Sequence, residues 1–169
     1  MNFHEEVACS VDSQDNLLGS INRKDEVFGK HILRSASVFV QNISNNNILL
    51  QQRSKHSKKY PLHWDISGGG HVNYNESYEE CAKRELFEEV GIKANSLQLL
   101  GKHFFVLDNN RKRFSCSFVA KINDDNTLNI DNTEVEQVKW LSIEEIKQMI
   151  QNREPFHPEC KFLLETYIL

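Results

Sequence analysis

Residues 70–92, GHVNYNESYEECAKRELFEEVGI, decide the fold because they predict one helix with charged groups beside its core-facing side. Ser77 and Glu80 have the spacing of a capping box, which marks a helix start. Gly91 is a favourable helix stop, because glycine adopts the left-handed conformation that other residues resist. The stretch therefore predicts a helix over residues 78–90, with three consecutive glycines at 68–70 shortly before it.

An apolar stripe orients this predicted helix. At about 100° per residue, Ala82, Leu86 and Val90 fall in one line along the helix. A stripe of this kind packs on other elements, so the helix must lie against a core. The glycines before it would let the backbone approach a ligand site at this helix without hindrance from Cβ atoms.

Three carboxylates adjoin the stripe. Glu85 lies three residues before Glu88 and four before Glu89, so each of these two pairs consists of neighbours on the helix that repel one another by about 0.2–0.5 kcal/mol. A solvated acidic face relieved by Lys83 and Arg84 is the ordinary alternative, but such a face would lie opposite the stripe. A hard divalent cation fits better, because Mg²⁺ binds carboxylate oxygens and completes its shell with water and phosphate.

Extended segments precede and follow this helix. The patterns predict a hairpin over residues 35–53, a short extended piece at 64–67, a second hairpin over 97–122 and a strand at 135–142. A capping box at Ser142 and Glu145 predicts a helix over 142–152, and PECKFLLETYIL closes the chain as another. This order predicts an α/β fold with a mixed sheet between helices.

The chain is expected to form one structural unit. Its 169 residues with 39% hydrophobic content suffice for one core and are too few for two comfortable domains. We assign residues 34–169 to the main domain and residues 1–33 to an N-terminal extension packed on its core. The segment VACSVDSQDNLLGSINR in this extension is compatible with an extra hairpin, and a homodimer is left open.

Composition narrows the classes of partner. The formal net charge of −4 gives no electrostatic reason to expect a nucleic-acid partner. No apolar run approaches the roughly 20 residues that cross a bilayer, and the acidic N-terminus differs from a signal peptide. We therefore expect a cytoplasmic protein without a membrane partner. Its four cysteines are expected to be reduced, because they are widely spaced and include no CxxC pair: Cys9, Cys81, Cys116 and Cys160.

The opening stretch resembles the Nudix box. Gly70, Glu76 after five residues, and the run RELFEEVGI at 84–92 after seven more fill every fixed position of that motif. The resemblance extends over roughly residues 30–169 and implies a Nudix-type α/β/α sandwich. It also implies Mg²⁺- or Mn²⁺-dependent hydrolysis of a small molecule that contains a diphosphate.

The resemblance implies roles for individual residues. Glu85, Glu88 and Glu89 would bind the metal, with one of them a candidate general base, and the carbonyl of Gly69 is a further candidate ligand. Arg84 and Glu76 would support the site as a pair. A glutamate outside the box commonly completes such sites, and Glu134 and Glu136 are both candidates, with an ordinary surface role as the alternative for either.

The stretch QQRSKHSKKYPLHWDISGGGHV, residues 51–72, resembles the isopentenyl-diphosphate isomerase branch of the same superfamily. By this resemblance Arg53 and Lys58 would hold the diphosphate, which suits a bidentate guanidinium and a mobile ammonium. His71 matches a metal-binding histidine of that branch, although a polar loop residue is an equal alternative. The remaining basic residues of the loop are expected only to keep it solvated: Lys55, His56 and Lys59.

Two departures favour hydrolysis over isomerisation. The isomerases use a cysteine where this chain has Gly69, and a second metal-binding histidine is replaced by Arg34. Isomerisation needs a proton donor and an acceptor on opposite faces of the substrate, and without the thiol one of them is missing. The isomerase and a non-catalytic module that senses a diphosphate ligand remain alternatives to the hydrolase.

The moiety attached to the diphosphate is not determined by any motif. A nucleotide sugar, a dinucleotide, an oxidised nucleoside triphosphate and an isoprenoid diphosphate all stay open. Several aromatic residues could stack on a base or line a prenyl pocket, although at strand spacing they are more often core: Tyr60, Trp64, Phe104, Phe105, Phe114 and Trp140.

Overall fold

A central strand, β3 (Ile32–Asn42), organises the molecule. In the computed structural model, which describes residues 7–123 and 128–169, β3 pairs antiparallel with β1, β4 and β6 and parallel with β8. The sheet is therefore mixed, as predicted. Its other strands are β1 (Val7–Val11), β2 (Leu17–Asn22), β4 (Ile48–Arg53), β5 (Trp64–Asp65), β6 (Gly68–His71), β7 (Gln98–Leu107), β8 (Arg111–Ile122) and β9 (Val135–Leu141).

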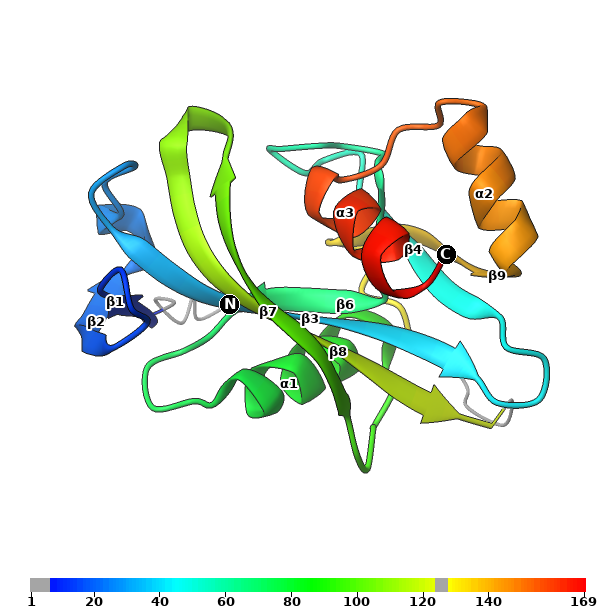
Figure 1. Cartoon of the computed structure of the whole chain (residues 1–169), viewed down its shortest axis with the longest axis horizontal. Helices are drawn as coiled ribbons and strands as arrows, with labels where there is room; N and C mark the ends of the chain where they lie inside the picture. The colour runs from blue at the N-terminus through cyan, green and yellow to red at the C-terminus, as the bar shows by residue number, and fades with distance from the viewer. Residues whose placement is uncertain (1–6, 124–127) are drawn as a thin grey trace.

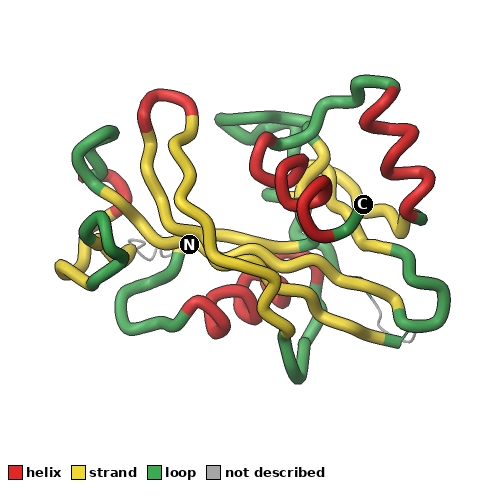
Figure 2. The backbone as a smooth tube through the Cα atoms, viewed as in Figure 1, coloured by secondary structure: helices red, strands yellow, loops and turns green. Residues whose placement is uncertain are grey.

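Helices lie on both sides of this sheet (Figure 1). On one side is α1 (Tyr78–Val90), and on the other are α2 (Ile143–Gln151) and α3 (Pro158–Tyr167). Short 3-10 helices, Arg23–Asp25 and Asp108–Asn110, follow β2 and join β7 to β8. Figure 2 shows the strands running as one continuous layer between the helices. The predicted α/β/α sandwich is confirmed.

Alternating residues of β3 divide the interior into two cores. Ala36, Val38 and Val40 pack with the apolar stripe of α1, and Phe39 points to the opposite core, formed with α2 and α3. Both faces of this strand are therefore buried, and β3 reads as a nearly continuous run of buried residues.

The helix predicted over residues 78–90 is present with both predicted ends. The side chain of Ser77 accepts a hydrogen bond from the backbone N–H of Glu80, and that of Glu80 accepts one from the N–H of Ser77. Gly91 ends the helix in the left-handed conformation, with φ of 79°. Leu86 is fully buried, and its Cα would lie 2.9 Å from a Cβ added at Gly68. Glycine is thus required where β6 passes the helix.

The hairpins differ in how closely they match the sequence patterns. The second hairpin, β7 with β8, is paired along nearly its whole length as predicted. In the first, β3 and β4 pair only through Val40 with Leu49 and Gln41 with Ile48, because most of β3 pairs with β6 and β8 instead. The sequence pattern correctly predicted the turn between β3 and β4. It did not predict the pairing of β3 with β6 and β8.

The N-terminal extension contributes a hairpin to the same sheet. Strands β1 and β2 pair with each other, and β1 also pairs with β3. Residues 1–6 of the extension lie outside the described residues, and its division from the main domain at residue 33 stays a prediction.

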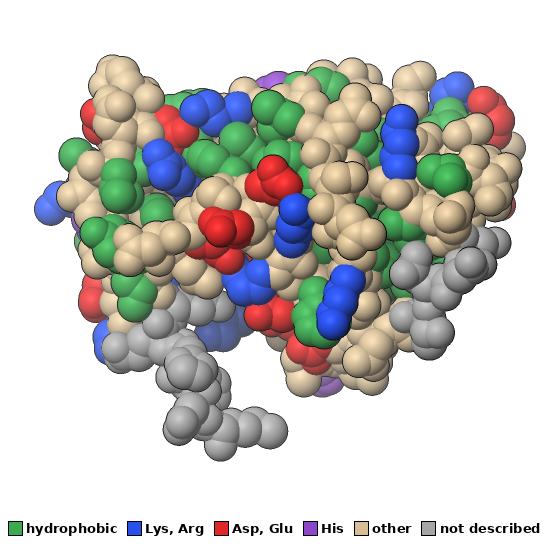
Figure 3. Space-filling view, turned by 90° about the horizontal axis from the view of Figure 1, so that it is seen from below, with side chains coloured by type: hydrophobic (Ala, Val, Ile, Leu, Met, Phe, Trp, Pro, Cys, Tyr) green, Lys and Arg blue, Asp and Glu red, His purple; other side chains and the backbone are tan. Residues whose placement is uncertain are grey.

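The described residues show how charged side chains are distributed on one side of the molecule and how apolar the helices are. Figure 3 shows the side that carries α1, where basic and acidic side chains of the described residues lie interspersed. None of the described helices is long and apolar enough to cross a membrane. The cytoplasmic location and the homodimer stay predictions. All four cysteines are buried and free, as expected.

Neighbouring substitutions in α1 test which side of the helix faces the core. Leu86→Ala is expected to lower the free energy of unfolding by about 2–5 kcal/mol, because it leaves a cavity in a fully buried site. Phe87→Ala, at a side chain 48% exposed, is expected to change it by less than about 1 kcal/mol. Urea unfolding measures both, and equal losses would contradict the orientation.

Candidate functional site

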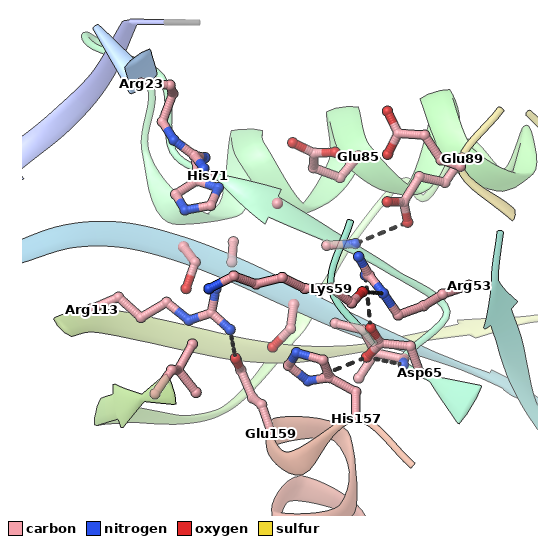
Figure 4. A pocket seen from close by; sticks show the side chains of 18 of the residues that line it. Arg23, Arg53, Lys59, Asp65, His71, Glu85, Glu89, Arg113, His157 and Glu159 are labelled. Carbon is pink, nitrogen blue, oxygen red and sulfur yellow. Dashed lines mark hydrogen bonds and ion pairs between the residues drawn. The ribbon is translucent and has the colours of Figure 1, made fainter. Parts of the chain in front are cut away.

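A cavity of about 1090 Å³ brings together segments that are distant in sequence (Figure 4). It is lined by the carboxylate edge of α1, by β6, by one face of β3 and β8, by the basic loop after β4 and by the start of α3. Its size suits a small-molecule ligand. Of the aromatic residues with open roles, Tyr60 lines this cavity, whereas Trp64 belongs to the core beside α3.

Glu89 is a buried acid of the cavity. Its Oε2 accepts hydrogen bonds from Nε2 of Gln51 at 2.7 Å and from the backbone N–H of Gly69 at 3.2 Å. Burial, and then the charge of Glu85, raise its pKa well above the ordinary value for a glutamate. A nearby positive charge would therefore stabilise the ionised form of this group.

Glu85 lies against the glycine strand. A Cβ at Gly70 would collide with its carboxylate, so a side chain at this position would displace the carboxylate of Glu85. Desolvation raises the pKa of Glu85 to about 7, and the charge of neighbouring Arg84 opposes the shift. Glu88 and Glu134 also line the cavity, and both charges act to raise the pKa of Glu85.

The pair of Arg84 and Glu76 predicted from the sequence is present. Arg84 donates to the two carboxylate oxygens of Glu76 at 2.8 and 3.0 Å, and to the backbone oxygen of His71 at 3.1 Å. Its Nη1 also contacts Glu85 at 2.8 Å and Glu88 at 3.0 Å. One guanidinium thus ties the loop before α1 to the helix and partly neutralises two of its carboxylates.

The carboxylates have the chemistry of a divalent-cation site without forming a closed cluster. Within residues 7–123 and 128–169, no three His, Cys, Asp or Glu side chains converge as a ready-made metal site. Two of the acids contact Arg84 instead. Glu85 and Glu89 nevertheless carry pKa values raised by burial, and the Glu88 side chain is 56% exposed. Partly buried oxygen donors that lack full neutralisation fit Mg²⁺ or Mn²⁺.

The structure separates the two candidate glutamates outside the helix. Glu134 lines the cavity beside the α1 carboxylates. Glu136 instead accepts from the backbone N–H of Lys55 at 3.2 Å and lies 3.5 Å from its Nζ, outside the cavity lining. Of the two, only Glu134 lines the cavity, and its role in completing a metal site stays a prediction.

The predicted phosphate-binding residues also reach the cavity. Arg53 and Lys58 both line it, and Nη1 of Arg53 contacts Asp65 at 3.2 Å. Lys59 lines it as well and points into it in Figure 4, so the expectation that this lysine only keeps the loop solvated is wrong. Three consecutive residues of the loop, Lys58, Lys59 and Tyr60, line the cavity. The sequence pattern does not show this arrangement.

His71 lies among positive charges. Burial lowers its pKa well below the ordinary value, and Arg23, Arg113 and Arg111 lower it further. These charges would also repel a cation, so they argue against a metal at His71, a role that stays a prediction. Arg34, the other departure from the isomerase pattern, does not line the cavity and contacts Asp15 at 2.7 Å.

Several residues of the cavity carried no signal in the sequence. Asp65 and Glu159 line the cavity, and Gln51 donates a hydrogen bond to the cavity residue Glu89, although none of the three was assigned a role from the sequence. His157 at the start of α3 lies 4.0 Å from Asp65, and burial is the main cause of its lowered pKa. Only tertiary contacts bring these residues to the site.

Comparison with known proteins identifies the family. The NUDIX domain model matches residues 31–160. The chain belongs to the Nudix family.

Relatives of this Nudix protein include different activities. A prenyl-diphosphate phosphatase of Methanosarcina mazei is 29% identical over 143 residues, covering 83% of this chain and 82% of its own. An isopentenyl-diphosphate Δ-isomerase of Haloarcula marismortui is 25% identical over 166 residues, covering 94% and 83%. The resemblance to the Nudix superfamily and to its isomerase branch is therefore confirmed.

A solved structure supports the Nudix fold. The DR0079 protein of Deinococcus radiodurans superposes with a TM-score of 0.78 at 23% identity, over 96% of this chain and 99% of that one. At this identity the likeness shows the fold, and the reaction must be argued from the cavity.

Substitution of Arg84 tests its place in this Nudix site. Arg84→Gln is expected to lower the free energy of unfolding by about 1–3 kcal/mol, because the partly buried Glu76 loses a bidentate partner. Lys83→Gln is the matched control. Its pair with Glu79 is half-exposed, so the expected change is at most about 1 kcal/mol. Chemical unfolding compares the two, and equal changes would show that Arg84 is not the tie described above.

Proposed function

We propose that this Nudix protein hydrolyses a phosphoanhydride bond in a small molecule that contains a diphosphate. The supporting observation is that one cavity holds both halves of the required chemistry. Glu85, Glu88, Glu89 and Glu134 supply oxygen donors on one side, and Arg53 and Lys58 supply positive charge from the loop.

The acidic side would hold Mg²⁺ or Mn²⁺. The candidate ligands are the carboxylates of Glu85, Glu88, Glu89 and Glu134 and the backbone of Gly69, which already contacts Glu89 through its N–H group. The bound cation would offset charge on the phosphate oxygens and increase the acidity of water. Arg84 and Glu76 would position these ligands by fixing the loop against α1.

The chain's own residues would then bind the substrate and accept a proton. Arg53, Lys58 and Lys59 would hold the phosphate oxygens, with the guanidinium able to donate two parallel hydrogen bonds. A water oxygen forms a bond to one phosphorus, the bridging P–O bond breaks, and the bridging oxygen leaves with the second phosphate. A cavity glutamate takes the proton from the attacking water, and its identity is left open.

The isomerase alternative is disfavoured at Gly69. A Cβ there would meet the side chain of Ile66 at 2.6 Å and the carbonyl oxygen of Ala36 at 2.9 Å. The backbone is therefore packed for glycine at the position where the isomerase branch has its thiol. The intact glutamate set favours catalysis over a purely sensing role.

Prenyl diphosphates are the second substrate class to be tested, because the Methanosarcina mazei relative is named for them. The cavity lining argues against a long apolar chain. Its aliphatic and tyrosine side chains are fewer than the charged ones: Val7, Ala36, Tyr60, Ile66, Tyr74 and Leu107.

Metal-dependent hydrolysis tests the proposal directly. Purified protein is expected to release phosphate-containing product from one class in a panel of nucleoside diphosphate conjugates, nucleoside triphosphates and prenyl diphosphates. EDTA should abolish turnover, and excess Mg²⁺ should restore it. Glu88→Gln and Glu85→Gln should lower kcat/KM by more than about 100-fold, since loss even of groups that support metal ligands costs up to that much.

Glu79→Gln is the control for these variants. It lies on the same helix, is exposed, and pairs with Lys83 outside the cavity, so its activity should match the wild type. Metal-dependent ligand binding without turnover would overturn hydrolysis in favour of sensing. Conversion of isopentenyl to dimethylallyl diphosphate would favour the isomerase.

A pair of lysines in the basic loop tests how the substrate is held. Lys58→Gln is expected to raise KM by about tenfold, because the cavity loses one charge-assisted contact to phosphate. Lys55→Gln, in the same loop but paired with Glu136, should leave KM unchanged. Steady-state kinetics on the best panel substrate compares them. Equal effects would mean that the loop acts only through its overall charge.

A further inference from the structure

The cavity has a second basic region, formed by Arg23, Arg111 and Arg113 around His71. Arg111 and Arg113 alternate along β8 with Ser115, so the three side chains share one face of the strand. Both Arg113 and Ser115 contact Glu159 of α3, which fixes that face toward the cavity. Arg23 comes from the 3-10 helix that follows β2 and lies beside His71 in Figure 4.

This arginine cluster lies apart from the diphosphate-binding residues. In Figure 4, Arg53 and Glu89 lie at one end of the cavity, and Arg23 and Arg113 lie at the other. The two groups also come from different elements. The first uses the end of β4, the loop after it and the helix α1, and the second uses β8 and the segment after β2.

The cluster combines ion pairs with an unpaired buried donor. Arg111 contacts Glu26 at 3.0 Å, Arg23 lies 3.9 Å from the same carboxylate, and Arg113 contacts Glu159. The Nε of Arg113 is buried and makes no hydrogen bond to any described residue. Buried donors of this kind normally have a partner, and an anionic ligand would supply one.

We propose that this arginine cluster binds a second anionic group of the substrate, so that the preferred substrates are diphosphate compounds bearing a further phosphate or carboxylate. This inference rests on the proposed hydrolysis. Guanidinium groups match both oxyanions because their fixed N–H donors can bind two oxygens at once. An uncharged sugar or a prenyl chain would leave these donors without an acceptor.

Phosphate binding without metal tests the cluster independently of hydrolysis. Inorganic phosphate is titrated in EDTA into the full-length protein, and the NMR signals of the His71 ring, assigned with His71→Gln, report on the cluster. We expect a saturable shift, weakened at least about tenfold by Arg23→Gln, because a charge-assisted contact is lost. Arg111→Lys, which keeps a cation beside Glu26, is a second variant in case Arg23→Gln does not fold.

Lys121→Gln is the matched control, since it removes a positive charge from an exposed position of β8 outside the cavity. Its phosphate affinity should equal that of the wild type. Unmoved His71 signals, or equal weakening by Arg23→Gln and Lys121→Gln, would overturn the proposal. Stronger weakening by Lys58→Gln than by Arg23→Gln would also overturn it, because the response would then report the diphosphate end.

Matched substrate pairs distinguish the two oxyanions. NADP⁺ against NAD⁺ tests a phosphate, and UDP-glucuronate against UDP-glucose tests a carboxylate. We expect kcat/KM to favour the charged member of at least one pair by about tenfold, and Arg23→Gln to move this ratio toward one. The ratio should be unchanged in Lys121→Gln.

The two experiments separate the two proposals. Hydrolysis without preference for the charged members would overturn the second-anion subsite and leave the hydrolase intact. Phosphate binding at the cluster without turnover of any pair would support the subsite and overturn hydrolysis of these compounds.

Discussion

The structure depends on the close approach of a glycine strand to one helix. Gly68 passes the backbone of Leu86, Gly70 leaves room for the Glu85 carboxylate, and Gly69 donates its N–H group to Glu89. A side chain at Gly68 would push β6 away from the backbone of α1, and one at Gly69 would collide with Ile66 and with β3. Since β6 also pairs with the central strand β3, this contact fixes where the carboxylates lie relative to the whole sheet.

Close packing brings the glutamates together, and neighbouring residues neutralise only part of their negative charge. Arg84 neutralises Glu85 and Glu88 from one side, and Gln51 and Gly69 donate hydrogen bonds to Glu89. Burial still raises the pKa values of Glu85 and Glu89. The residual demand for positive charge is the physical reason why a cation and a phosphate chain suit this edge of the helix.

The opposite end of the cavity carries positive charge. Arg23 and Arg113 lie at that end, while Arg53 lies at the end of Glu89 (Figure 4). A ligand that spans both ends of the cavity would therefore carry anionic groups at separate points. Within one family fold, such lining residues distinguish substrates, because the α/β/α frame and the glutamates can stay the same while the walls change.

The sequence by itself determined α1, its two ends and the set of glutamates, because caps, helical periodicity and the Nudix box are local patterns. Its resemblance to the isomerase branch also singled out Arg53 and Lys58, which line the cavity. Only the tertiary structure placed Glu134 in the cavity lining and Glu136 outside it, brought Lys59 inward and gathered Arg23 with Arg113 around His71. The physical reason is that these contacts join strands and loops far apart in the chain, where no local pattern records which segments pair.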